Sequence, residues 1–168
     1  MILSAGLCAG VLLPATAAAQ DTIPNTAAWR ANTGVVTGLG FMLLIPKHGD
    51  VGFGLDFGLR YGIPVGPFIL APGALISGSY LQSRFVGDLM GTARVTLPIG
   101  LLAPFVHGGI GGGTLTNPSD GGVAWMAGGG LVVHLGGVLA LGLELNYKTI
   151  TDTRFEAWTV GPTIAFGG

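Results

Sequence analysis

Apolar and polar residues alternate strictly along residues 138–150. One parity is continuously apolar and consists of Leu139, Leu141, Leu143, Leu145 and Tyr147. The other parity is small, polar or charged and consists of Ala140, Gly142, Glu144, Asn146 and Lys148. Because a β-strand directs alternate side chains to opposite faces, this pattern predicts a strand. A helix, turning about 100° per residue, would mix the charged residues with the leucines. A strand between lipid and a polar lumen requires such alternation.

The same alternation recurs in three other parts of the chain. In residues 51–61, aromatic and aliphatic residues share one parity, and Asp56 and Arg60 share the other with glycines. Residues 85–97 and 158–166 repeat the pattern. Agreement between four separate segments indicates that the period of two is a property of the whole fold.

The whole chain divides into eight strand-like runs of about 10–13 residues, the length that a tilted strand needs to cross a bilayer. These runs are residues 33–45, 51–62, 67–80, 85–97, 103–115, 123–135, 138–150 and 156–167. An even number of strands closes into an antiparallel barrel that leaves no unpaired edge in lipid. The sequence therefore predicts an all-β fold, an eight-stranded antiparallel up-and-down transmembrane β-barrel over residues 33–168.

The connections between these runs are of two kinds, and the two kinds alternate. The short, uncharged connections are residues 63–66, 98–102 and 136–137. The connections that carry charges are residues 47–50, 80–84, 116–122 and 151–154. Because outer-membrane barrels have tight periplasmic turns and longer external loops, we expect the uncharged connections at the periplasmic rim.

The composition agrees with a membrane protein. Of the 168 residues, 49% are hydrophobic and 9% charged, and the mean hydropathy is +0.68. Soluble domains carry about 25% charged residues. Beyond the N-terminus there is no uninterrupted apolar run of the length of a membrane-spanning helix, so an ordinary helical membrane protein is not expected. The net charge is −1 without a basic block, which argues against nucleic-acid binding.

The N-terminus has the pattern of an export signal over residues 1–19. An apolar stretch over residues 2–13 is followed by Pro14, and Ala17 and Ala19 supply the small residues of a cleavage site. No lysine or arginine precedes the apolar stretch, and a retained anchor helix is the alternative. The sole cysteine, Cys8, lies in this segment. A polar leader is expected over residues 20–32.

The chain resembles the small outer-membrane barrels of the OmpA/OmpX-like type. The resemblance rests on the export signal, the eight strands, the stretch at residues 142–147 and the closing stretch at residues 161–166. It implies a location in the bacterial outer membrane, contact with outer-membrane lipids and lipopolysaccharide, insertion by the barrel assembly machinery, and a monomer. One departure is the end of the chain, where Gly167 and Gly168 follow Phe166 instead of a terminal aromatic residue.

Aromatic residues gather near the ends of the predicted strands, as expected for rings at the headgroup levels of a membrane. Those near the external ends are Tyr80, Phe85, Trp125, Tyr147, Phe155 and Trp158. Those near the periplasmic ends are Tyr61, Phe68, Phe105 and Phe166. We expect Tyr61, Tyr80, Trp125, Tyr147, Trp158 and Phe166 in particular to lie at the membrane interface.

Six charged residues have the parity of the lumen: Asp56, Arg60, Asp88, Arg94, Glu144 and Lys148. The interior of an eight-stranded barrel is just wide enough for side chains to fill it. Unpaired charges there would be costly, so the balanced signs predict an internal ion-pair network that plugs the lumen. The competing interpretation is a narrow polar channel, widened by inward glycines such as Gly54 and Gly58.

No residue pattern predicts a catalytic, cofactor-binding or metal site. His48, His107 and His134 have no partner at ligand spacing, and no serine is placed beside a histidine on a strand face. The glycine runs at residues 108–113 and 128–130 lack the lysine and hydroxyl residue of a phosphate-binding loop, and are interpreted as bends of the sheet.

We therefore expect a non-enzymatic outer-membrane barrel with a structural or surface-interaction role and a plugged lumen. A narrow, porin-like passive channel for ions or small solutes is the first alternative. The second is a helical inner-membrane protein packed through glycines, for which residues 126–145 are the best candidate. The alternation and the ten prolines oppose that second alternative.

Overall fold

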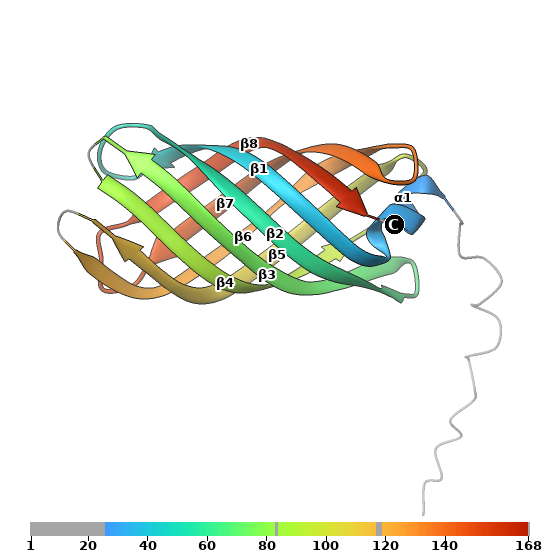
Figure 1. Ribbon diagram of the computed structural model, residues 1–168, viewed down its shortest axis with the longest axis horizontal. Coiled ribbons are helices and arrows are strands. Elements are labelled where there is room, and N and C mark those ends of the chain that lie inside the picture. The colour runs from blue at the N-terminus through green and yellow to red at the C-terminus, as the bar shows by residue number, and fades with distance from the viewer. Residues whose placement is uncertain (1–25, 83, 117–118, 168) are drawn as a thin grey trace, which may run out of the picture.

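The computed structural model describes residues 26–82, 84–116 and 119–167. Eight antiparallel strands follow one another around a closed barrel, and β8 pairs with β1 (Figure 1). The predicted fold class is confirmed. The predicted signal, residues 1–19, and the first part of the predicted leader lie outside the described residues.

The observed strands lie close to the predicted ones. Their bounds are β1 Gly34–Pro46, β2 Gly52–Val65, β3 Phe68–Leu81, β4 Arg84–Thr96, β5 Leu102–Leu115, β6 Asp120–Leu135, β7 Leu139–Ile150 and β8 Glu156–Gly167. The largest differences are three residues each: β2 ends at Val65 instead of residue 62, and β6 begins at Asp120 instead of residue 123. There Asp120, Gly121 and Gly122 continue the pairing with β5 into a stretch rich in turn-forming residues.

The two faces of the strands differ as the alternation predicts. On β7, Leu141, Leu143 and Leu145 are exposed on the outside of the barrel, and Asn146 and Lys148 are buried inside it. The exposed apolar side chains of all eight strands form a continuous hydrocarbon surface. A closed ladder with such a surface meets both demands of the bilayer interior, because every strand edge is paired and lipid meets apolar groups.

The three uncharged turns lie at one rim, together with the start of β1 and the end of β8 (Figure 1). Each contains a glycine at positive φ: Gly66 at +59°, Gly100 at +65° and Gly136 at +90°. Residues with a side chain rarely adopt this conformation, so glycine permits these tight turns. We call this rim the α1 end and the opposite rim the loop end.

A short helix, α1 (Ala27–Asn32), precedes β1 and lies across the α1 end of the barrel (Figure 1). The Thr26 hydroxyl accepts a hydrogen bond from the Trp29 amide, which caps the helix. The helix occupies the second half of the predicted leader. In the described part of the chain, no helix has the length and apolar character needed to cross a bilayer.

Cysteine scanning provides a residue-level test of the wall. Single cysteines at positions 139–147, in a chain with Cys8 replaced by serine, are expected to be quenched by a lipid-phase spin label at every second position. Strong quenching should coincide with Leu141, Leu143 and Leu145, which are exposed on the outside. Fluorophore labelling and quenching in lipid vesicles measure this directly, and a period near 3.6 would contradict the strand.

Candidate functional site

The interior of the barrel consists of a polar middle between two apolar layers. The loop-end layer is formed by Met42, Leu44, Val86, Met90, Leu115, Ala124, Met126, Ile150, Phe155 and Ala157. The α1-end layer is formed by Ala28, Val36, Ala103, Phe105, Val132, Ala140 and Ala165. The predicted lumen charges have the inward parity of their strands, with Asp88 and Lys148 towards the loop end and Arg60 and Arg94 towards the α1 end.

Lys148 and Asp88 form a buried ion pair next to the loop-end layer. The Lys148 Nζ lies 3.1 Å from Asp88 Oδ2, and the side chains of both residues are less than 5% exposed. Ser77 completes the cluster, since its Oγ accepts a hydrogen bond from Lys148 at 2.6 Å and donates one to Asp88 at 2.5 Å. The serine links the two charges and satisfies groups that burial would otherwise leave unpaired.

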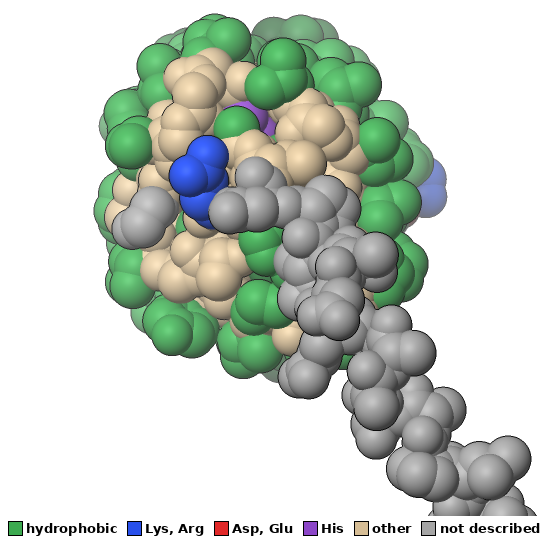
Figure 2. Space-filling view, turned by 90° about the vertical axis from the view of Figure 1, so that its right-hand side faces the viewer, with side chains coloured by type: hydrophobic (Ala, Val, Ile, Leu, Met, Phe, Trp, Pro, Cys, Tyr) green, Lys and Arg blue, Asp and Glu red, His purple; other side chains and the backbone are tan. Residues whose placement is uncertain are grey.

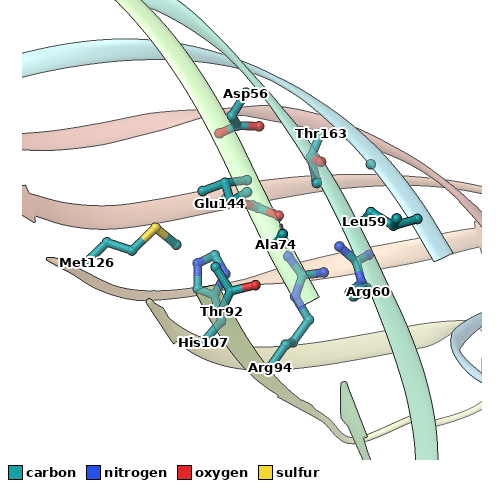
Figure 3. A pocket seen from close by; sticks show the side chains of 13 residues that line it. Asp56, Leu59, Arg60, Ala74, Thr92, Arg94, His107, Met126, Glu144 and Thr163 are labelled. Atoms are coloured by element: carbon teal, nitrogen blue, oxygen red, sulfur yellow. Dashed lines mark hydrogen bonds and ion pairs between the residues drawn. The ribbon is translucent and has the colours of Figure 1, made fainter. Parts of the chain in front are cut away.

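A second ion pair spans the middle of the lumen. Arg94 on β4 donates a hydrogen bond of 2.7 Å to Glu144 on β7, on the far side of the barrel (Figure 3). The Arg94 guanidinium also lies over the ring of Phe105, with its Cζ 3.6 Å from the ring centroid. The carboxylate and the aromatic face together stabilise a cation that is removed from water.

Asp56 and Arg60 lie beside this pair without joining it. Among the described residues, neither makes an ion pair or a side-chain hydrogen bond. Both line a cavity of about 30 Å³, together with Arg94 and Glu144 (Figure 3). A cavity of this size and polarity has room for one or two water molecules. We call it the central chamber.

His107 also lines the central chamber, and its Nε2 donates to the Asn146 Oδ1 at 2.5 Å. His134 lies nearer the α1 end, where its Nε2 accepts a hydrogen bond of 2.8 Å from the Asn32 amide of α1. Among the described residues, no group of three or more histidine, cysteine or acidic side chains could hold a metal ion. Both histidines bind amide side chains and pack within the wall of the barrel.

Four of the six predicted interface aromatics lie at the loop end, in two ladders of rings. Trp125, Tyr147 and Trp158 form a ladder across β6, β7 and β8, with neighbouring ring centroids 5.4 and 5.2 Å apart. Phe53, Tyr80 and Phe85 form a second ladder across β2, β3 and β4. Tyr61 and Phe166 are exposed near the α1 end.

Two other aromatics differ from the sequence expectation that placed them at the headgroup levels. Phe105 and Phe155 are buried inside the barrel, 5% and 7% exposed. Phe105 has the inward parity of β5 and supports Arg94, and Phe155 precedes β8 and packs into the loop-end layer. The expectation used their position near strand ends and overlooked the direction of the side chain.

The contact between Ser77 and Lys148 raises the question of nucleophilic chemistry, since a neighbouring base can activate a serine. Here the lysine ammonium group donates a hydrogen bond to the serine oxygen and is paired with Asp88, so the lysine has the role of a cation and not of a base. Ser77 is 5% exposed. The arrangement neutralises buried charge and offers no room for a substrate.

Neither a known protein family nor a curated protein matches the chain by sequence. Solved structures do match. Neisserial surface protein A (NspA) has a TM-score of 0.60 at 9% identity, over 80% of this chain and 96% of its own. Ail, the attachment invasion locus protein of Yersinia pestis, has a TM-score of 0.59 at 12% identity, over 80% and 98%. The outer membrane protein OprG of Pseudomonas aeruginosa has a TM-score of 0.53 at 10% identity, over 82% and 97%.

The fold is that of the small bacterial outer-membrane β-barrels. The chain covers nearly the full length of each of these structures, so the likeness includes the whole barrel. This confirms the resemblance inferred from the sequence at the level of the fold. The likeness concerns the fold alone, and the ion pairs and apolar layers of the lumen are described from this chain and not from those structures.

Proposed function

We propose that the chain is a closed barrel of the bacterial outer membrane with a structural or surface-interaction role and without enzymatic activity. The observation that carries the proposal is the filled interior, with an apolar layer at each end and buried ion pairs between them. Charges enclosed in this way fix the wall and leave no continuous polar path. The six predicted lumen charges would then plug the barrel.

The outside of the barrel supports its placement. The uncharged turns of the α1 end suit the periplasm, and the charged loop end, with the Lys47–Glu156 pair among its side chains, suits the cell surface. The Trp125–Tyr147–Trp158 ladder would lie at the level of lipopolysaccharide headgroups, where Tyr147 donates a hydrogen bond to Glu156. Lipids and lipopolysaccharide are the proposed surroundings, the barrel assembly machinery the means of insertion, and the monomer the functional unit.

The placement has a direct test. The expressed chain should fractionate with the outer membrane and migrate differently on a gel before and after heating, because closed barrels resist denaturation by detergent. Recovery in the inner membrane with a helical circular dichroism spectrum would contradict both the proposed location and the fold.

The closed lumen predicts electrical silence. Folded protein reconstituted in a planar bilayer should give no discrete openings, because both apolar layers exclude water and ions. Arg94→Ala should lower stability, since Glu144 would remain buried without its partner. Regular openings from the unmodified protein would instead favour the narrow passive channel.

A further inference from the structure

The two apolar layers are built differently. The wall residues of the loop-end layer include Met42, Leu44, Met90, Met126 and Ile150, whose long side chains meet across the lumen. The wall residues of the α1-end layer are small apart from Phe105, being two valines and three alanines. The remaining space at that end is occupied by α1, whose Ala28, Trp29, Ala31 and Asn32 are buried.

The wall is shaped to receive this helix. A β-carbon added at Gly62 would lie 1.8 Å from the backbone oxygen of Asn32, and one added at Gly167 would lie 2.0 Å from that of Ala31. Any side chain at these two positions would therefore collide with α1. Figure 2 views this end and shows hydrophobic side chains around the circumference, with polar and backbone atoms towards the middle.

Few directional contacts hold α1 in place. The bonds of Thr26 and Thr33 are made within the segment itself. Among the described residues, the hydrogen bond from Asn32 to His134 is the one that a side chain of α1 makes to the wall. A helix of six residues is not stable alone, so α1 is helical because it is docked. Local opening of such an element costs much less than unfolding the barrel.

The charges behind α1 are arranged in order of depth. Arg60 lies four residues nearer the α1 end of β2 than Asp56, and it has no ion-pair partner among the described residues. Arg94 and His107 also line the central chamber. A solute that entered from the α1 end would therefore meet the Arg60 cation before the Asp56 carboxylate.

We propose that α1 is a displaceable plug over a dead-end chamber. When α1 leaves its socket, small anions reach Arg60 and Arg94 from the α1 end, and the loop-end layer still prevents passage through the barrel. The proposal rests on the closed loop-end layer of the proposed function, and adds a one-sided opening and a ligand class to it.

Thiol labelling tests the plug. Thr92→Cys, in a chain with Cys8 replaced by serine, places a thiol on the lining of the central chamber. Adding Ala28→Glu puts a carboxylate at a fully buried position of α1. Adding Arg30→Glu puts a carboxylate on its exposed face, a control whose net charge changes by −2 instead of −1. The Ala28→Glu chain should react at least about ten-fold faster with a small anionic methanethiosulfonate, because labelling follows the population of the open state.

The charge of the reagent tests the ligand class. In the Ala28→Glu chain, the anionic reagent should react faster than a cationic one of similar size, after each rate is divided by its rate with a free thiol. Equal rates in the Ala28→Glu and Arg30→Glu chains would overturn the plug, and a faster cationic reagent would overturn the preference for anions. Heat-modifiable migration shows whether Ala28→Glu folds. If it does not fold, Gly62→Ala replaces it in the test, because a side chain at position 62 would displace α1 from the wall.

Conductance separates this proposal from the previous one. The Ala28→Glu chain should remain silent in planar bilayers, since the loop-end layer is intact, and openings would contradict the dead end. Openings from the unmodified chain contradict the closed barrel itself. A silent unmodified chain with unchanged labelling rates contradicts the plug alone.

Discussion

Replacing Lys148 with methionine is expected to lower the free energy of unfolding by about 3–5 kcal/mol. The substitution removes the cation that lies 3.1 Å from Asp88, and among the described residues it leaves that buried carboxylate with the Ser77 hydroxyl as its one remaining side-chain partner. Desolvated, uncompensated charge is the source of the cost. Equilibrium unfolding in urea measures the change in the free energy of unfolding. Heat-modifiable migration on a gel, or tryptophan emission in lipid vesicles, is the readout.

Two controls isolate the buried charge. Lys47→Met removes an exposed lysine whose side chain is 61% exposed and pairs with Glu156, and should cost at most about 1 kcal/mol. Combining Lys148→Met with Asp88→Asn should recover much of the lost stability, because the amide removes the orphaned charge and still accepts from Ser77. Similar losses for Lys148→Met and Lys47→Met would show that the pair is not desolvated.

Replacing Leu143 with arginine should cost about 2–4 kcal/mol, because the side chain would enter hydrocarbon at mid-depth. Leu143 is 58% exposed on the outer face near the middle of β7. Its neighbour Glu144 faces the lumen, so Glu144→Gln changes only the pairing with Arg94. Equilibrium unfolding in lipid vesicles of defined thickness measures the change in the free energy of unfolding for Leu143→Arg and for Glu144→Gln.

Leu101 provides a matched control for depth. It is also 58% exposed, but lies in the turn between β4 and β5 at the rim of the barrel. Leu101→Arg should therefore cost no more than about 1 kcal/mol, since the charge reaches the membrane interface. An equal cost at both positions would mean that Leu143 does not lie deep in lipid.

The strands and their facing could be predicted from the sequence because a period of two is a local property. The parity of residues 138–150 alone places Leu143 outside and Glu144 inside, and the structure has both there. The partners across the lumen could not be predicted. Arg94 meets Glu144 from a strand three places away around the barrel, and such contacts depend on strand tilt and stagger, which no single segment encodes.

Some features that the predictions from sequence missed did leave a signal in the sequence. Phe105 shares its parity with His107, so the alternation of β5 already directs the ring inward. Ser77 likewise has the inward parity of β3, although its place between Lys148 and Asp88 needs the pairing register. The helix α1 begins after Thr26, a good N-cap residue, but six residues are too few for a helical period to stand out.

The three tryptophans of the chain are divided between the two ends of the barrel. Trp29 is buried at the α1 end of the barrel, where it is 7% exposed. Trp125 and Trp158 are exposed on the outer face at the loop end. Their emission spectra therefore respond to different events during insertion, the entry of the wall into lipid and the docking of α1. Stopped-flow fluorescence of chains that keep one tryptophan at a time can order these two events without any attached dye.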